Sequence, residues 1–468
     1  MRTQSSSRVK KKKITIALLV AICLVSAFVM VIPVTIAKND SLKEPKFRRS
    51  DNPILHMPVD EEKWLPIIPP EPVGRPLDED AEKDIEILIY NVKTKKTKKI
   101  LKNFTKSDKT TLKLPGSKGS LPSELVPESV IPPDDRVRIT PTTDYPWRTI
   151  CKLWMYFPSS GWFMGSGFII DNNHVLTAGH CAYDPDLDEW ATSIEVIPAL
   201  DGGYGPFYHA WATRWVVNSY WYDYGSYQDD FAILTLDRNV GAFTGWMGLE
   251  YADPSNSIYT GILDTAGYPG DLDIGWNMYF DSDLGAGADE FNHWYYMDTA
   301  GGQSGSPVWY IDGTSRNVLS VHAYGAGWPL YPNSNMGTRL SEYWFGLIDY
   351  VREGDTPPID YANLIDDGPA YSGFTPFTVY QDITYFSVWS SERNIGTANT
   401  GGYNVSYYAS VDSDITTSDY LIGKEYADDL SPFTYHDSNC SGVFPSNIPT
   451  GTYWVGWIIT VMTMSMSL

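Results

Sequence analysis

The chain has 468 residues, of which 43% are hydrophobic, 14% aromatic and 20% charged, a mixture that excludes a disordered, collagen-like or polytopic membrane protein. Residues 1–128 hold 24 Lys and Arg against 16 Asp and Glu, whereas residues 129–468 hold 11 against 41, so the net charge of −22 arises in the second part. A body this acidic repels phosphate backbones, and we therefore expect no nucleic-acid partner.

The N-terminus has the layout of an export signal. Arg2, Arg8 and the lysines at residues 10–13 precede an uncharged apolar stretch, residues 14–37. This stretch is longer than a signal core of about 7–15 residues and matches the roughly 20 that span a bilayer. Two alternatives stay open, a signal peptide removed after residue 37 and an uncleaved anchor. In both cases we expect the protein outside the cytoplasm, either secreted or anchored to the membrane.

Residues 38–128 form a segment rich in Pro, Lys and acidic residues, with one weak strand-like run at residues 85–90 and a lysine cluster at residues 93–99. We interpret this segment as a prosegment, and the alternative is a flexible spacer. The two interpretations are compatible, because a removable basic segment can cover an acidic domain electrostatically.

Between residues 145 and 350 the chain consists of short apolar or alternating runs rich in Val, Ile, Trp and Tyr, separated by Gly, Asp, Asn and Pro. The strand candidates include residues 150–157, 166–170, 193–198, 231–236 and 318–322. Short strands at this spacing predict an all-β barrel or sandwich. Only the stretch near residues 340–351 has a helical pattern.

Two motifs in this β-rich region indicate nucleophilic catalysis. Thr-Ala-Gly-His-Cys contains His180, and Gly-Gly-Gln-Ser-Gly-Ser-Pro contains Ser304. A serine hydroxyl needs an imidazole to take its proton, and a buried carboxylate fixes the tautomer of that ring. We therefore predict His180 as the general base and Ser304 as the nucleophile. The backbone N–H groups of Gly302 and Ser304 are the expected donors to an oxyanion.

The carboxylate should lie between the two motifs if the chain order is His, Asp, Ser. Asp229 and Asp230 are both present. We choose Asp230, because it directly precedes the apolar run at residues 231–236 and can point inward, whereas Asp229 would point to the opposite face. Each motif alone is weak evidence. Their joint occurrence predicts an active triad, and the alternative is a catalytically dead relative.

The C-terminal part follows a linker at residues 354–362 and has strand candidates at residues 377–389, 403–411 and 452–459. These candidates are separated by turn residues and predict a small β-sandwich. The runs Asn394-Ile-Gly-Thr-Ala-Asn-Thr-Gly-Gly and Gly451-Thr-Tyr-Trp-Val-Gly-Trp resemble the CARDB-type adhesion modules of exported proteins. The resemblance implies a binding or spacing role, with a cell-surface partner.

With these motifs, residues 129–351 resemble the chymotrypsin-like serine peptidases, and most of all the bacterial glutamyl endopeptidases. The resemblance also includes Ser-Val-Ile-Pro-Pro-Asp-Asp-Arg from Ser129 onward, Gly-Tyr-Pro-Gly-Asp at residues 267–271 and Val-His at residues 321–322. It implies two six-stranded antiparallel β-barrels with the active site in the cleft between them. It further implies polypeptide substrates, cleavage after glutamate and less often aspartate, and no cofactor.

In that family the glutamate pocket uses a histidine on the strand after the nucleophile, a threonine shortly before it and, in some members, the α-amino group of the mature N-terminus. The resemblance implies His322 and Thr299 for the first two roles, and Ser129 or Val130 as the mature start, with Ser129 taken as the pocket residue. A bound carboxylate needs hydrogen-bond donors and positive charge, which imidazole, hydroxyl and ammonium groups supply. The alternative for His322 is a structural core histidine. Glu128 precedes Ser129, so an enzyme that cuts after glutamate could remove its own prosegment.

Relatives that have a disulfide beside the catalytic histidine often place its partner where this chain has Met164. Cys181 then pairs with Cys151, pairs elsewhere or stays reduced, and a Cys151–Cys181 disulfide is a tentative expectation. The acidic clusters at residues 184–189 and 271–273 lack EF-hand spacing. Solvated loops are therefore favoured over calcium sites, and we predict no metal.

These predictions combine into one organisation. The expected parts are a signal peptide or anchor (1–37), a prosegment or spacer (38–128), a trypsin-like peptidase domain (129–353), a linker (354–362) and a CARDB-like β-sandwich (363–468). The predicted function is that of an exported serine endopeptidase that cleaves after glutamate. The alternative function is a non-catalytic cell-surface adhesion or binding protein that keeps the peptidase fold.

Overall fold

The structure is a computed structural model. It describes residues 32–36, 65–66, 85–102, 129–355, 364–366, 373–375, 378–379, 381–382, 384–412 and 415–461. Most of the predicted signal or anchor, residues 14–31, and part of the predicted linker lie outside the described residues. No helix within the described ranges is both long enough and apolar enough to cross a membrane.

Six strands between residues 150 and 236 form a first closed antiparallel barrel, called barrel 1 below. They are β6 (Ile150–Phe157), β7 (Gly161–Ile169), β8 (His174–Thr177), β11 (Ser193–Pro198), β12 (Ala210–Asn218) and β13 (Ala232–Leu236). Their order is β11-β6-β7-β8-β13-β12, and pairing of β11 with β12 closes the barrel. The strands predicted at residues 150–157 and 193–198 have the observed bounds.

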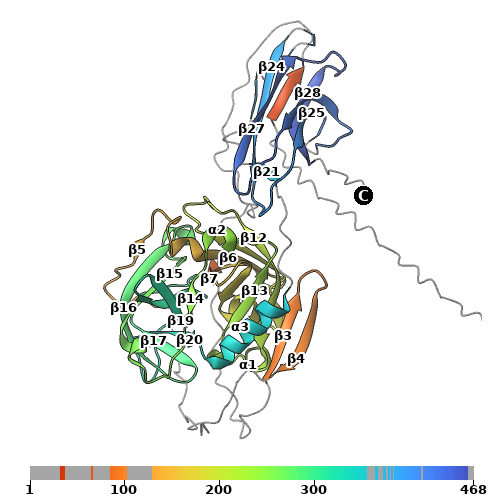
Figure 1. The fold of residues 1–468 in the computed structure, drawn as a ribbon. Helices are drawn as coiled ribbons and strands as arrows, with labels where there is room; N and C mark the ends of the chain where they lie inside the picture. The colour runs from red at the N-terminus through yellow and green to blue at the C-terminus, as the bar shows by residue number, and fades with distance from the viewer. Residues whose placement is uncertain are drawn as a thin grey trace, which may run out of the picture.

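A second closed barrel, barrel 2, follows in the chain (Figure 1). Its strands are β15 (Ile262–Gly267), β16 (Tyr279–Ala288), β17 (Asn292–Tyr295), β18 (Pro307–Asp312), β19 (Ser315–Tyr324) and β20 (Asn335–Arg339). Pairing of β19 with β20 closes it, and the short strands β5 (Val137–Arg138) and β14 (Gly248–Leu249) extend it. Two six-stranded antiparallel barrels confirm the predicted fold class.

The two barrels share a buried apolar cluster. Phe168 and Leu176 of barrel 1 belong to the same cluster as Ala266 and Val321 of barrel 2. Helix α3 (Glu342–Gly354) packs on barrel 1 through Trp344, whose ring stacks on Phe231 with centroids 4.2 Å apart. The helix predicted near residues 340–351 is therefore confirmed. Two shorter helices, α1 (Ser219–Tyr224) and α2 (Gly241–Thr244), were not predicted, because they are too short for a 3.6-residue pattern to appear.

Three of the described strands come from residues 38–128, the predicted prosegment or spacer. β3 (Ile85–Asn91) and β4 (Lys96–Lys102) form a hairpin, and β3 pairs with β12 of barrel 1. The strand predicted at residues 85–90 is confirmed. The two-residue strand β2 (Leu65–Pro66) pairs in parallel with β7. In Figure 1 the orange hairpin lies beside α3 and α1.

The C-terminal strands form two small sheets that share one apolar core. One sheet holds β23 (Thr378–Val379), β25 (Tyr403–Ser410), β26 (Tyr420–Ala427) and β28 (Gly451–Val461); the other holds β21 (Leu364–Asp366), β22 (Gly373–Thr375), β24 (Tyr385–Asn394) and β27 (Tyr435–Val443). Phe386 and Val388 of one sheet pack in the same cluster as Tyr407 and Trp457 of the other.

A strand from the N-terminus completes the first of these sheets. β1 (Ile32–Ile36) lies between β28 and β23, antiparallel to the former and parallel to the latter. The sequence Ile-Pro-Val-Thr-Ile is rich in β-branched residues, which favour a strand. The last residues of the predicted apolar signal or anchor are therefore part of a β-sheet in this structure, a placement that the sequence did not predict.

Candidate active site

The side chains of His180 and Asp230 meet at the ends of two neighbouring strands of barrel 1. His180 lies in a 3₁₀ turn just after β8, and Asp230 lies just before β13, which pairs with β8. Nδ1 of His180 is 2.7 Å from Oδ2 of Asp230, and the backbone N–H of His180 donates to Oδ1 at 2.9 Å. Both side chains are buried. A Cβ at Gly179 would lie 3.0 Å from Oδ1 of Asp230, so this close approach favours glycine.

The neighbouring Asp229 has different partners. Its carboxylate accepts hydrogen bonds from Nδ2 of Asn218 at 2.6 Å and from Oγ of Ser226 at 2.8 Å. The structure thus brings Asp230, and not Asp229, to the imidazole. The catalytic role of Asp230 stays a prediction.

Ser304 lies in a glycine-rich loop between β17 and β18. Gly302 and Gly305 have φ values of +102° and +90°, and a Cβ at Gly305 would lie 2.1 Å from the carbonyl oxygen of Ser166. Residues other than glycine are strained at positive φ values such as these. Ser166 of barrel 1 holds the loop, because its N–H donates to the carbonyl of Ser304 and its hydroxyl to that of Gly302, both at 2.8 Å.

The loop of Ser304 reaches the immediate neighbourhood of His180. The thiol of Cys181, the residue after His180, donates to the carbonyl oxygen of Ser304 over 3.8 Å. The buried Nε2 atom of His180 has no hydrogen-bond partner within the described part of the chain. Residues 124 positions apart in the sequence therefore come together at the junction of the two barrels.

Two aromatic rings flank His180 and were missed by sequence reasoning. The ring centroids of Trp221 and Tyr324 each lie 6.4 Å from that of His180. Trp221 is held by a hydrogen bond from its Nε1 to the carbonyl of Tyr183 at 3.1 Å. No motif marks these residues, because α1 and β19 bring them to His180 only in the folded chain. The rings shield the His180–Asp230 pair from water, which strengthens its electrostatic interaction.

His322 lies on β19 and is tied to the serine loop. Its carbonyl accepts from the N–H of Gly305 at 2.8 Å, and its N–H donates to the carbonyl of Ser306 at 2.9 Å. Nδ1 of its ring is 2.5 Å from the hydroxyl of Tyr295. Burial, with a smaller effect from the nearby His180, lowers the pKa of His322 to about 3. The ring is therefore neutral at neutral pH.

Ser129 lies next to Thr299. The carbonyl of Ser129 accepts from the N–H of Thr299 at 3.4 Å and from Nδ2 of Asn335 at 2.7 Å, and its N–H donates to Oδ1 of Asn335 at 3.1 Å. The Oγ1 atom of Thr299 is buried and has no hydrogen-bond partner among the residues that the structure describes. Asn335, which anchors Ser129, was not predicted from the sequence.

Three carboxylates form an acidic group next to this region. One oxygen of each of Asp135, Asp281 and Asp298 lies within 4.8 Å of the others, a geometry that could hold a metal ion. Asp298 already accepts backbone hydrogen bonds from Ile131 at 2.5 Å and Asp135 at 3.2 Å. Burial, followed by the repulsion from Asp281 and Asp135, raises the pKa of Asp298 to about 6. The acidic clusters considered from the sequence, at residues 184–189 and 271–273, do not include these residues.

The tentative Cys151–Cys181 disulfide is wrong. Cys151 is a free cysteine. Both thiols are buried, and they donate to different carbonyl oxygens, Cys151 to that of Thr149 over 3.7 Å and Cys181 to that of Ser304 over 3.8 Å. The β6–β7 ladder brings Cys151 opposite Gly167, two positions from the strand residue that faces Cys181. The side chain of Cys181 is instead directed at Gly165, where a Cβ would lie 3.1 Å from its sulfur.

Two closed six-stranded barrels with His180, Asp230 and Ser304 at their junction have the architecture of the trypsin-like serine peptidases. The trypsin family model matches residues 143–269. The glutamyl endopeptidase of Bacillus licheniformis is 33% identical over 225 residues, which cover 47% of this chain and 67% of that protein. The chain belongs to the trypsin-like serine peptidase family.

Two further proteins are similar to this chain. A protein named extracellular metalloprotease, from Bacillus subtilis, is 30% identical over 263 residues, which cover 55% of this chain and 81% of that protein. The solved structure of a Glu endopeptidase in complex with MPD is 25% identical and has a TM-score of 0.42, covering 48% of this chain and all of that one.

Proposed function

We propose that this protein is an exported serine endopeptidase that cleaves peptide bonds after glutamate, and less often after aspartate. The observation that carries the proposal is the buried hydrogen bond between His180 and Asp230, with the loop of Ser304 held beside it. The likeness to a glutamyl endopeptidase supports the specificity.

In the proposed mechanism the Oγ atom of Ser304 attacks the substrate carbonyl while Nε2 of His180 takes its proton. Asp230 keeps the other proton on Nδ1 and stabilises the imidazolium that forms. The N–H groups of Gly302 and Ser304 donate to the oxyanion. His180 then protonates the leaving amine, and water hydrolyses the acyl-enzyme by the same steps. Polypeptide is the substrate, and no metal or organic cofactor takes part.

In the proposed glutamate pocket His322, Thr299 and Ser129 bind the substrate carboxylate. Nδ1 of His322 and the hydroxyl of Tyr295 share a hydrogen bond. In the proposed arrangement the hydroxyl donates, so that the proton of the neutral imidazole is on Nε2 and faces the substrate carboxylate. Thr299 adds a hydroxyl. Ser129 adds an ammonium group once the bond to Glu128 is cut.

Hydrolysis of a chromogenic peptide with glutamate before the cleaved bond tests this function. We expect turnover by the purified protein and a loss of kcat by a factor of about 10⁴ or more in Ser304→Ala, because the nucleophile is removed. Mapping the bonds cut in a defined protein then tests the specificity. Cleavage without preference for acidic residues would contradict the pocket, and the absence of any turnover would contradict the enzyme.

We also propose self-processing at Glu128, since the chain beyond that bond already occupies its position beside Thr299. Glu128→Gln should block maturation of the purified protein, because glutamine lacks the charge that the pocket binds. N-terminal sequencing after incubation measures this. A normal mature start at Ser129 in Glu128→Gln would contradict self-processing.

For the remaining parts we propose that residues 1–37 direct export, so that the protein is either secreted or anchored to the membrane on its extracellular side. We propose that residues 38–128 are the prosegment. We propose that the two C-terminal sheets form a CARDB-like module for a cell-surface partner. The uncharged apolar N-terminal stretch supports the first part of this proposal, and the small shared core of the two sheets supports the last.

A further inference from the structure

The hairpin β3–β4 completes an edge of barrel 1. The beginning of β12 pairs with β11, through Ala210 and Trp211, and closes the barrel. The end of β12 diverges from β11 and pairs instead with β3, from Arg214 opposite Asn91 to Asn218 opposite Ile87. Without β3 this half of β12 would present unpaired backbone groups, which in a sheet edge invite pairing with another chain.

The side chains of β3 are part of the core of barrel 1. Ile87 and Leu88 are fully buried, and Ile89 and Tyr90 are nearly so. They alternate between the two core clusters of the barrels, Leu88 and Tyr90 in one and Ile87 and Ile89 in the other. The Tyr90 ring stacks on that of Trp215, with centroids 5.2 Å apart. Four consecutive buried side chains are typical of a central strand and not of a spacer.

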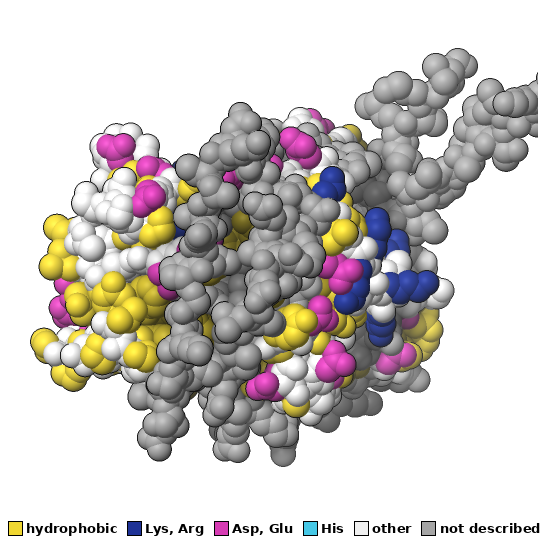
Figure 2. Space-filling model, turned by 90° about the horizontal axis from the view of Figure 1, so that it is seen from below, with side chains coloured by type: hydrophobic (Ala, Val, Ile, Leu, Met, Phe, Trp, Pro, Cys, Tyr) yellow, Lys and Arg dark blue, Asp and Glu magenta, His cyan; other side chains and the backbone are white. Residues whose placement is uncertain are grey.

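The outer strand of the hairpin is basic and faces an acidic body. The Nζ atom of Lys99 lies 3.7 Å from a carboxylate oxygen of Asp223 and 5.3 Å from the ring centroid of Tyr222. Lys102 lies 4.9 Å from the ring centroid of Tyr350 on α3. Figure 2 shows Lys and Arg side chains gathered at the side where Figure 1 places the hairpin, on a face that elsewhere carries acidic groups. The attraction between the two parts adds to the burial of β3.

We propose that this hairpin stays bound to barrel 1 as a separate, non-covalently held chain after the prosegment is cut at Glu128. The mature enzyme is then a complex of two chains, in which a fragment that contains residues 85–102 supplies a strand of the catalytic domain. This inference rests on the proposed cleavage at Glu128. The fragment before Glu128 also carries β1, which pairs with β28, and β2, which pairs with β7. The test therefore separates the hairpin from these two strands, and it does not depend on the cut at Glu128.

The test uses full-length Ser304→Ala protein with the recognition sequence of an unrelated site-specific protease inserted twice, between Pro66 and Ile85 and between Lys102 and Ser129. Cutting at both insertions, together called the inserted site, separates the hairpin from β1 and β2 as well as from the peptidase domain. Cutting at that sequence requires no activity of the protein itself. We expect the hairpin fragment to elute with the peptidase fragment in size-exclusion chromatography and to contribute its mass to the complex in native mass spectrometry. Separation of the fragments, with the larger one keeping its circular dichroism spectrum, would overturn the proposal.

The unaltered enzyme is then incubated until Glu128 is cut. Recovery of the N-terminal fragment together with the peptidase supports retention in the mature enzyme. If Glu128 is not cut, self-processing fails, whereas retention of the hairpin is still decided by the inserted site.

Two leucines of the hairpin provide a matched pair of variants. Leu88 is fully buried, whereas Leu101 is 61% exposed. After cutting at the inserted site, we expect Leu88→Asp to increase the free fragment at least about tenfold and Leu101→Asp to leave it bound. Leu88→Ala, which removes apolar contact without adding charge, replaces Leu88→Asp if that chain does not fold. Equal retention in the Leu88 and Leu101 variants would overturn the proposal.

Discussion

Asp229 and Asp230 are adjacent in the chain, but their carboxylates have different partners. Asp230 accepts from the ring and the backbone of His180, and Asp229 accepts from Asn218 and Ser226. Both are buried, so burial alone does not distinguish the two residues. The difference comes from the direction of each side chain at the start of β13, where Ala232 is the first residue of the strand.

This difference predicts opposite outcomes for two conservative variants. We expect Asp230→Asn to lower kcat/KM on a glutamyl peptide by about 10⁴, because an amide at this position no longer fixes the tautomer of His180. Asp229→Asn keeps one acceptor for its neighbours and should remain within about tenfold of the unaltered enzyme. Steady-state kinetics measure both. A larger loss in Asp229→Asn than in Asp230→Asn would contradict the assignment.

Lys152 is an unusual residue in the core of barrel 1. Its side-chain nitrogen Nζ is buried and makes no hydrogen bond to any described residue. It lies 4.8 Å from the ring centroid of Trp154 and 5.7 Å from that of Tyr268. Burial lowers the pKa of Lys152 well below its usual value. A group whose pKa is lower in the folded chain binds fewer protons there than in the unfolded chain, so the folded chain loses stability as the pH falls below the usual lysine pKa.

We therefore expect Lys152→Met to raise the free energy of unfolding at pH 7 by about 1–3 kcal/mol, because a buried amine without a partner is replaced by an apolar side chain. The gain should be smaller at pH 10 than at pH 7. Urea unfolding at the two pH values measures it. Lys96→Met, at an exposed site on β4, serves as the control and should change stability by less than about 0.5 kcal/mol. A destabilised Lys152→Met chain would show that the amine has a favourable role.

At the scale of elements, local sequence patterns predict some features of the structure and miss others. The bounds of β6 and β11 follow from their apolar runs and flanking turn residues, and the helix near α3 follows from its period. The pairing of β3 with β12 and the position of β1 beside β28 could not be predicted, because both depend on contacts between residues more than 100 positions apart. A strand pattern specifies a strand but not its neighbour.

The same limit applies to the candidate site. Short motifs indicated His180 and Ser304, and alternation selected the aspartate that the structure places beside the imidazole. Trp221, Tyr324 and Asn335 carried no signal, because their positions follow from closure of the barrels. The expected cysteine pairing did not form for a related reason: β7 lies between the strand of Cys151 and the strand that precedes Cys181.

At the scale of the molecule, the acidic body and a glutamate substrate have charges of the same sign. The chain after residue 128 holds 41 acidic against 11 basic residues, and such a field repels an acidic peptide at low salt. We expect kcat/KM for a glutamyl peptide to rise as NaCl increases from about 10 to 150 mM, because the Debye length shortens from roughly 30 to 8 Å.

The matched substrate is a peptide that keeps the same glutamate before the cleaved bond and carries two added lysines at its ends. Its net charge is reversed, so its kcat/KM should fall over the same salt range. Equal and flat profiles for the two peptides would contradict control of the encounter rate by the acidic field.

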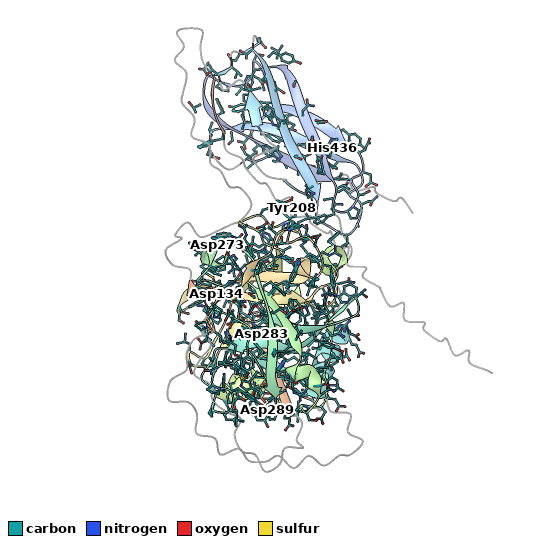
Figure 3. All side chains as sticks on the ribbon, turned by 90° about the vertical axis from the view of Figure 1, so that its left-hand side faces the viewer. Asp134, Tyr208, Asp273, Asp283, Asp289 and His436 are labelled. Carbon is teal, nitrogen blue, oxygen red and sulfur yellow. The ribbon has the colours of Figure 1, made fainter. Side chains whose placement is uncertain are left out.

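The C-terminal module contacts barrel 1 through defined side chains. Phe433 packs on Phe243, with ring centroids 4.6 Å apart, and Nη2 of Arg238 donates to the carbonyl of Ile395 at 2.9 Å. Figure 3 places Tyr208 at this junction, where the guanidinium of Arg393 lies 5.9 Å from its ring centroid. The contact combines apolar, hydrogen-bonded and cation–π interactions.

These contacts favour one orientation of the module relative to the peptidase domain. A partner bound to the module would lie at a fixed distance and angle from the cleft between the barrels. The position of a peptide bond on that partner would then decide, together with the residue before it, whether the bond is cut. Binding through the module raises the local concentration of cleavage sites near the bound surface of the partner. The same sequence farther from that surface would stay uncut. Phe433→Ala, which weakens the contact with Phe243, would then increase the number of different bonds cut on a bound partner. It would leave the cleavage of a free peptide unchanged.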